Sequence, residues 1–265
     1  MINYFADKKQ AMQHAHQVDN YVRKNHAQEV DKLAHDTRIF PHMDVVPTPE
    51  GCRFGIEWEL VISQETTVDA IFEMALKYDG KIAALNFASY KQPGGLFLGG
   101  SKAQEECLCH ESWLYPVLSS EYLQDKFYRP NAKRLNKALY NSNLMYTPCV
   151  PFVRGNNTVN ADVITCAAPN KKAAQKYQNV PDAEVSKAMY HRIDSLLYAA
   201  VVMNAEILIF GAFGCGVFGN DLTEVSEMFK ELLYKKYRGC FKHVVFAIPD
   251  TPSVDIATKV FSVTE

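Results

Sequence analysis

Residues 82–106 read Ile-Ala-Ala-Leu-Asn-Phe-Ala-Ser-Tyr-Lys-Gln-Pro-Gly-Gly-Leu-Phe-Leu-Gly-Gly-Ser-Lys-Ala-Gln-Glu-Glu. The apolar run Ile82–Phe87 is short and favours a strand that is buried on both faces. A glycine-rich turn follows, whose backbone N–H groups can approach a ligand closely, and a helix is expected from Gln104 onward. This order of strand, glycine-rich loop and helix is the one in which open α/β sheets bind ligands at the carboxyl ends of their strands.

A second unit of the same kind lies later in the chain. Glu206–Phe210 predicts a strand, which runs directly into the glycine-rich loop Gly211–Asn220. Asp221 and Glu224 then form a D-x-x-E capping box that opens a helix. Eight of the 13 glycines lie in the two loops, a concentration that ordinary turns do not explain. Because a glycine loop and a helix N-terminus both offer N–H groups to an anion, the pair predicts a site for a diphosphate-bearing sugar.

The remaining segments favour the same architecture. Further strands are expected at residues 56–62, 162–166 and 243–248, and further helices at 66–78, 184–203 and 221–233. Residues 119–158 are irregular and predict an insertion with a helix near 133–144. Residues 253–263 are compatible with a short terminal helix or an edge strand. Strands that alternate with helices predict a three-layer α/β/α domain with a mixed central sheet.

The first part of the chain has a different character. Residues 4–36 are polar and contain neither proline nor glycine, which predicts one or two helices. Their histidines share no ligand spacing, so all four are expected at solvated surface positions: His14, His16, His26 and His35. Prolines at 41, 47 and 49 with Gly51 mark a loop or boundary. We therefore expect a helical N-terminal extension at residues 1–50 and the α/β domain at residues 51–265.

Composition narrows the class of protein. Hydrophobic residues make up 48% and charged residues 22% of the 265 residues, as in soluble globular proteins. The net charge of −2, without a basic run, gives no support for a nucleic-acid surface. No stretch resembles a signal-peptide core or a membrane span. The seven scattered cysteines indicate reduced thiols, so a cytoplasmic protein is expected.

Motifs for several other sites are absent or incomplete. Cys107-Leu-Cys109-His110 offers metal-ligand side chains but has no second ligand cluster downstream, so helix-borne thiols are the preferred interpretation. The sequence has no G-x-x-x-x-G-K-[ST] motif, which argues against a P-loop nucleotidase. The loop at Gly211 does not fit the G-x-G-x-x-G dinucleotide fingerprint, and Glu231, at about the ribose-binding distance, falls inside a helix.

The adjacent carboxylates Glu105 and Glu106 add acid–base capacity to the first loop. On a helix their side chains diverge by about 100°, so one can face a ligand while the other supports it. A carboxyl group close to another carboxylate and to a bound diphosphate has a raised pKa and can act as a general acid at neutral pH. Alone, such a pair is more often a surface pair that satisfies the helix dipole. Its position directly after the glycine loop favours a functional role.

Three blocks carry a resemblance to a known family. Residues 86–106, with Pro-Gly-Gly-Leu at 93–96 and Gln-Glu-Glu at 104–106, resemble the signature of poly(ADP-ribose) glycohydrolases, in which three glycines precede Gln-Glu-Glu by a short spacer. Val163–Asn170 and Gly211–Asp221 resemble blocks of the microbial-type members. The likeness spans residues 80–250 and implies a macrodomain-like fold preceded by a helical N-terminal region.

The resemblance also implies a site and a reaction. Glu106 matches the catalytic acid, Glu105 and Gln104 would orient the distal ribose, and Phe218 would cover that sugar. The substrate-binding residues expected from it are Asn86, Gly94, Gly95, Leu96, Gln104, Gly214, Cys215, Gly216, Val217 and Phe218. The implied reaction cleaves the ribose–ribose O-glycosidic bond of ADP-ribose or poly(ADP-ribose) on a modified protein. The implied reaction needs no metal or cofactor. We also expect a monomer, with neither nucleic acid nor a membrane as partner.

One residue departs from the family pattern. Leu96 stands where the family has its third glycine, and its side chain is expected to narrow the distal-ribose pocket. If the position requires a positive φ, leucine there is strained by about 1 kcal/mol or more. Two alternatives to a glycohydrolase therefore stay open. One is an ADP-ribose-binding reader with impaired turnover, and the other is a hydrolase of a different ADP-ribosyl linkage.

Overall fold

A mixed seven-stranded sheet forms the centre of the molecule. The computed structural model describes residues 5–50 and 58–262, and within them the strand order is β1-β4-β5-β3-β6-β7-β2. The bounds are β1 Arg38–Phe40, β2 Glu59–Ser63, β3 Ile82–Phe87, β4 Leu144–Arg154, β5 Asn157–Cys166, β6 Ile207–Phe210 and β7 His243–Ala247. β4 is antiparallel to both of its neighbours, whereas the strands from β5 to β2 are parallel.

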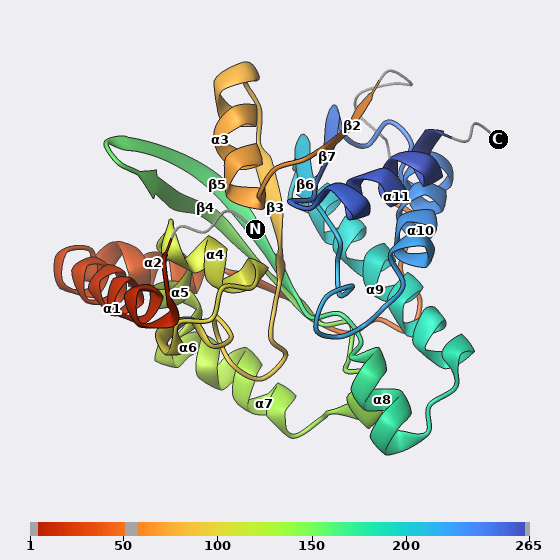
Figure 1. Cartoon of the computed structure of the whole chain (residues 1–265), viewed down its shortest axis with the longest axis horizontal. Coiled ribbons are helices and arrows are strands. Elements are labelled where there is room, and N and C mark those ends of the chain that lie inside the picture. The colour runs from red at the N-terminus through yellow and green to blue at the C-terminus, as the bar shows by residue number, and fades with distance from the viewer. Residues whose placement is uncertain (1–4, 51–57, 263–265) are drawn as a thin grey trace.

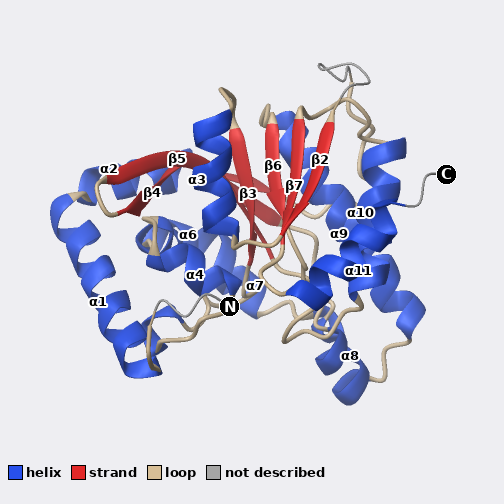
Figure 2. Ribbon diagram, turned by 45° about the horizontal axis from the view of Figure 1, so that its top comes forward, coloured by secondary structure: helices blue, strands red, loops and turns tan. Residues whose placement is uncertain are grey.

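Helices cover both faces of this sheet (Figures 1 and 2). Successive side chains of a strand point to opposite faces of the sheet, so alternate residues of β3 pack into two separate cores. Ile82 and Ala84 pack with α1 to α5, while Ala83 and Leu85 pack with α9 to α11. The longer helices are α1 Lys8–Asn25, α2 Ala27–Asp36, α3 Thr67–Lys77, α4 Gln104–His110, α5 Leu114–Leu118, α8 Lys171–Gln178, α9 Asp182–Val202, α10 Leu222–Lys235 and α11 Thr251–Ser262. The prediction of three α/β/α layers is confirmed.

Shorter helical turns connect these elements. They are η1 Phe97–Gly99, α6 Glu121–Leu123, η2 Gln124–Tyr128, α7 Arg129–Ala132 and η3 Asn136–Ala138. The predicted start of α10 is confirmed, because the Asp221 side chain accepts a hydrogen bond of 2.9 Å from the Glu224 N–H. The i, i+3, i+4 spacing of Val68, Ile71, Phe72, Ala75 and Leu76 predicts one apolar face of α3. The prediction is wrong for Leu76, whose side chain is exposed.

The N-terminal helices are part of the packed core. Ala15 and Val22 of α1 and Val30 of α2 are buried in the same cluster as β3, and β1 extends the sheet by pairing with β4. The backbone of α1 also lies against the first glycine loop. Gly100 has φ +74°, and a Cβ there would lie 2.4 Å from the carbonyl oxygen of Lys8. The loop therefore ends directly on α1, and only a glycine fits at that contact.

The histidines of this segment are less solvated than predicted. His14 Nδ1 lies 3.1 Å from Nδ1 of His110, and His26 packs on the ring of Trp113. His35 is exposed but stacks on Tyr122. The prediction is therefore wrong for His14 and His26, because their aromatic partners come from segments far along the chain.

The segment between residues 119 and 158 differs most from the prediction. Residues 133–144 form one short turn, η3, instead of a helix, and the long hairpin β4–β5 takes up much of the expected insertion. Pro148 and Pro151 within β4 conceal that strand in the sequence, since proline is unusual inside a strand. The register of β4 shifts between Thr147 and Val150, where the strand bulges. At the other end of the chain, residues 253–263 fall largely within α11, a helix rather than an edge strand.

The cysteines only partly match the expectation of reduced thiols. The free thiols are Cys107, Cys109, Cys149, Cys166 and Cys215. Cys240 is disulfide-bonded, which corrects the prediction for that residue, and Cys52 lies outside the described residues. Among the helices of residues 5–50 and 58–262, none is long and apolar enough to cross a membrane.

Candidate active site

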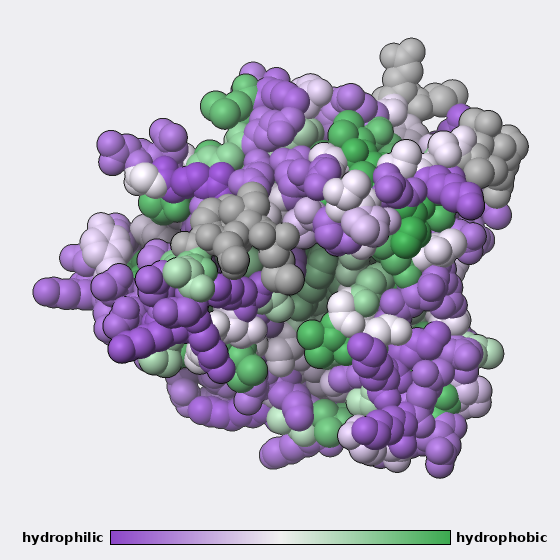
Figure 3. All heavy atoms as spheres, viewed as in Figure 1, coloured by the Kyte–Doolittle hydropathy of each residue, from purple (hydrophilic) through white to green (hydrophobic). Residues whose placement is uncertain are grey.

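A cavity of about 560 Å³ opens at the carboxyl ends of the parallel strands. Its walls include the loop after β3, the first turns of α4, the loop after β6, and residues 247–250, which begin with the last residue of β7. The space-filling view shows apolar side chains grouped around a hollow, with a mainly hydrophilic surface beyond it (Figure 3). The structure thus brings both glycine loops predicted from the sequence to one cavity.

The first glycine loop is shaped around the carboxylate of Glu106. Gly94 and Gly95 both have positive φ, at +65° and +58°. A Cβ on Gly95 would lie 2.5 Å from Glu106 Oε1, so the loop backbone and the carboxylate are in direct contact. The N–H of Leu96 donates a hydrogen bond of 2.9 Å to the same oxygen. The loop therefore holds one oxygen of Glu106 in place through its backbone.

The second oxygen of Glu106 has a different environment. Oε2 is buried and has no hydrogen-bond partner among the described residues, and Glu106 lines the cavity. The side-chain oxygen of the neighbouring Asn86 is likewise buried without a partner. Since buried polar atoms are nearly always hydrogen-bonded, the Oε2 of Glu106, which lines the cavity, is suited to contact a ligand there.

Glu105 is held more firmly than its neighbour. Its Oε2 accepts a hydrogen bond of 2.7 Å from the Ser89 N–H, and Asn86 Nδ2 lies 3.3 Å from its Oε1. Burial, with a smaller contribution from the charge of Glu106, raises the pKa of Glu105 to about 8, although the Ser89 N–H opposes the shift. Glu105 is therefore mainly protonated at neutral pH, and it places no full negative charge beside Glu106.

The proton on Glu105 is expected to appear in the pH dependence of stability. The ordinary pKa of this carboxyl is 4.5 and the folded value is about 8, so its stabilising contribution is full below the lower value and is lost as the pH rises toward the upper one. Glu105→Gln carries no titrating proton. We expect the melting temperature of wild type to fall relative to this variant between these two values, as measured by calorimetry. A difference that does not change with pH would contradict the assignment.

The side chain of Gln104 connects α4 to β3. Its Nε2 donates to the Leu85 carbonyl at 2.8 Å and to the Thr67 hydroxyl at 3.1 Å, and its Oε1 accepts from the Phe87 N–H at 2.8 Å. The amide group thus bonds to β3 and to the start of α3. It sets the position from which the two following carboxylates reach the cavity.

The second glycine loop is fixed from behind by Asn220. The Asn220 Nδ2 donates to the carbonyls of Pro169 and Gly214 at 2.9 and 3.0 Å. Gly214 has φ +74°, and a Cβ there would lie 2.5 Å from Ala168 Cβ. Of the residues predicted in this loop, Gly214, Gly216, Val217 and Phe218 line the cavity, whereas Cys215 does not. In the first loop Gly95 and Leu96 line it, whereas Gly94 does not, and neither does Asn86 of β3.

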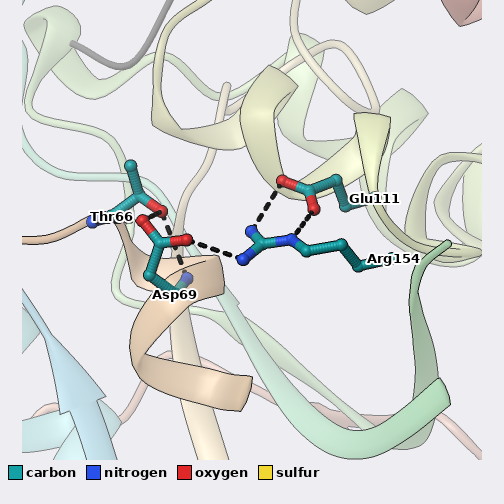
Figure 4. Close-up of polar contacts among 4 residues, drawn as sticks. All are labelled: Thr66, Asp69, Glu111 and Arg154. Atoms are coloured by element: carbon teal, nitrogen blue, oxygen red, sulfur yellow. Dashed lines mark hydrogen bonds and ion pairs between the residues drawn. The ribbon is translucent and has the colours of Figure 1, made fainter. Parts of the chain in front are cut away.

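An ion-pair network braces the far side of α4 (Figure 4). Arg154, at the end of β4, binds both carboxylate oxygens of Glu111, at 2.5 and 3.1 Å, and Asp69 at 2.8 Å. Asp69 in turn forms a capping box with Thr66 at the start of α3. The arrangement ties the start of α3, which borders the cavity, and the C-terminal end of α4 to the hairpin. Among the described residues, no group of three or more side chains of the metal-ligand types could hold a metal ion.

Two parts of the site were not found from the sequence. One is the Ser89 N–H beside Glu105, a backbone contact that side-chain chemistry does not reveal. The other is the segment 247–250, which lines the cavity after β7. Its position directly after a buried parallel strand was a usable signal, because ligands bind at the carboxyl ends of such strands.

Comparison with known proteins gives consistent matches. The family described as "Microbial-type PARG, catalytic domain" matches residues 6–155. The poly(ADP-ribose) glycohydrolase of Deinococcus radiodurans in complex with ADP-ribose is 33% identical and has a TM-score of 0.80 over 88% of this chain and 97% of that one. The Thermomonospora curvata enzyme bound to the inhibitor ADP-HPD is 29% identical, with a TM-score of 0.83 over 94% and 98% of the two chains.

A further relative matches a smaller part of the chain. The ADP-ribose glycohydrolase of Archaeoglobus fulgidus is 34% identical over 79 residues. The match spans 29% of this chain and 41% of the length of that relative.

Proposed function

Because the chain belongs to the family of microbial-type PARG catalytic domains, we propose that its cavity binds ADP-ribose and that Glu106 is the catalytic acid. The protein is a glycoside hydrolase that acts on ADP-ribosyl linkages. The proposed reaction cleaves the ribose–ribose O-glycosidic bond at the end of poly(ADP-ribose), or releases ADP-ribose from a modified protein.

One observation carries the role given to Glu106. Its Oε1 is held by the Leu96 N–H, while its Oε2 is buried in the cavity wall without a partner. Such a carboxyl can transfer a proton to the leaving ribose oxygen as the bond from that oxygen to the anomeric carbon breaks. An oxocarbenium-like centre then develops, a water molecule adds its oxygen to the anomeric carbon, and its released proton returns to the carboxylate.

The other residues are assigned supporting roles. Glu105, which is buried and mainly protonated, orients the distal ribose with Asn86 and Gln104. The backbone of the second loop, at Gly214–Phe218, holds the diphosphate, and the ring of Phe218 covers the ribose. The first loop borders the same cavity, but its N–H groups at Gly95 and Leu96 already donate to the Gln92 carbonyl and to Glu106. The positive φ of Gly214 supports the assignment because such turns present N–H groups to anions.

Release of ADP-ribose from an automodified polymerase tests the proposal. We expect wild type to release ADP-ribose and to bind it in calorimetry. Binding without release would overturn the glycohydrolase reaction and favour a reader. Release from ADP-ribosylated bases, with none from the polymer, would favour a different linkage. A cytoplasmic monomer remains part of the same proposal.

Leu96 does not have the strain that would favour a reader. Its φ is −107°, outside the left-handed region, and its side chain is 62% exposed at the cavity mouth. Its N–H makes the contact to Glu106 that any residue at this position can make. We therefore expect Leu96→Gly to change the rate of ADP-ribose release by less than about threefold, since surface substitutions without a buried partner have small effects. A large gain in rate would instead show that Leu96 limits turnover.

A further inference from the structure

A buried positive charge lies behind one wall of the cavity. Arg192 of α9 is 2% exposed. Its Nη1 donates to the carbonyl of Ala167, and its Nη2 donates to the carbonyl of Leu139 at 3.0 Å. Its Nε has no hydrogen-bond partner among the described residues. The guanidinium is therefore surrounded by neutral acceptors.

No carboxylate within the described part of the chain pairs with this guanidinium. Asp194, two residues along α9, forms an ion pair with Lys236 at 2.8 Å and accepts from the Tyr237 hydroxyl at 2.6 Å. The ionisable groups that interact electrostatically with Arg192 are Cys166, Tyr90 and Tyr140. All three are neutral at pH 7. Burial lowers the pKa of Arg192, but a guanidinium stays protonated at neutral pH.

Two chains of contact connect Arg192 to the second glycine loop. Ala167, whose carbonyl it binds, is followed by Ala168, which lines the cavity and packs against Gly214. On another side lies Tyr140, which interacts electrostatically with Arg192. The centroid of its ring is 6.2 Å from the ring centroid of Phe218, which also lines the cavity. The charge is thus separated from the cavity wall by one residue, beside the second glycine loop.

An unpaired buried charge costs several kcal/mol unless something compensates it. Hydrogen bonds to two carbonyls do so only in part, because they leave the net charge in place. In a weakly screened interior, that charge produces a positive potential in the neighbouring cavity. An anion bound at the loop would complete the compensation.

We propose that Arg192 is a positioning residue that gives the cavity a fixed positive potential and selects ligands with a diphosphate charge. The inference rests on the proposed function in one respect, since the anion is taken to be the diphosphate of ADP-ribose. It adds a cation to a site that otherwise holds phosphates through backbone N–H groups alone. Arg192 touches no substrate atom, and it acts through the charge behind the wall.

The test compares a charged ligand with a neutral one. Affinities for ADP-ribose and for adenosine are measured by calorimetry or competition with wild type, Arg192→Met and Arg192→Lys. We expect Arg192→Met to weaken ADP-ribose binding by about tenfold and adenosine binding by less than about twofold. Arg192→Lys keeps the charge and should keep most of the preference. Lys187→Met removes an exposed charge from the same helix and should change neither affinity.

The outcomes separate electrostatic from structural roles. Equal weakening of both ligands by Arg192→Met, or no weakening, overturns the inference. If Arg192→Met does not fold, Arg192→Lys decides, because loss of the ADP-ribose preference despite a retained charge also overturns it. A wild type that prefers ADP-ribose through Arg192 but releases none from polymer overturns the glycohydrolase proposal and leaves this inference intact.

Discussion

Glu106→Gln is expected to lower the rate of ADP-ribose release from an automodified polymerase by about 10²- to 10⁴-fold, the range that general acid catalysis contributes. The variant keeps a side-chain oxygen that can accept from the Leu96 N–H, and it keeps the size of the side chain. It cannot supply a proton to the leaving ribose oxygen. Affinity for ADP-ribose should change by less than about threefold, since the acid acts mainly in the transition state.

The comparison requires a variant with the same chemical change elsewhere. Glu227→Gln alters an exposed carboxylate of α10 and should leave release and binding at wild-type levels. Melting temperatures of both variants establish that they are folded. Equal release by wild type and Glu106→Gln would refute the catalytic role, and a parallel loss of binding would indicate a role in holding the substrate.

Gly95→Ala is expected to reduce ADP-ribose release by about 10²-fold, the scale of a misplaced catalytic group. The added Cβ would lie 2.5 Å from Glu106 Oε1 and 3.1 Å from Glu105 Oε2, so both carboxylates must shift. The residue also has φ +58°, which costs an alanine about 1–2 kcal/mol. Rates and melting temperatures measured together would show whether the loss is mainly catalytic.

The same loop offers a matched control for this change. Gly99 has no positive φ, and a Cβ there would have only one neighbour, Leu96 Cβ at 4.0 Å. Gly99→Ala should therefore retain activity close to that of wild type. If Gly99→Ala and Gly95→Ala lose activity equally, general flexibility of the loop would explain the effect better than contact with the carboxylates.

Three of the parallel strands were predictable because they are almost wholly buried. β3, β6 and β7 are short apolar runs, and their own sequences are enough to predict strands. The β4–β5 hairpin was not predictable in the same way. β4 contains two prolines and a bulge, so its sequence has no simple alternation, and its strand geometry depends on pairing with β5 and β1.

The site likewise has features that the sequence predicts and features that it does not. The glycine loops and the carboxylate pair have strong local signatures, so their meeting at one cavity could be predicted from chain order alone. The contacts that distinguish the two carboxylates could not. The N–H groups of Ser89 and Leu96 bond to different glutamates only because the backbone turns in a particular way. Arg192 lies beside the site because its guanidinium bonds to the carbonyl of Ala167, which is 25 residues away in the sequence. No sequence motif indicates this contact.

Gly100 packs closely against the Lys8 carbonyl, so α1 supports the loop that holds Glu106. A helix that no substrate atom needs to reach therefore shares in the precision of the reaction. A shortened version of the protein that began at the sheet would keep every residue assigned to catalysis, yet it would lose the surface against which their loop is set.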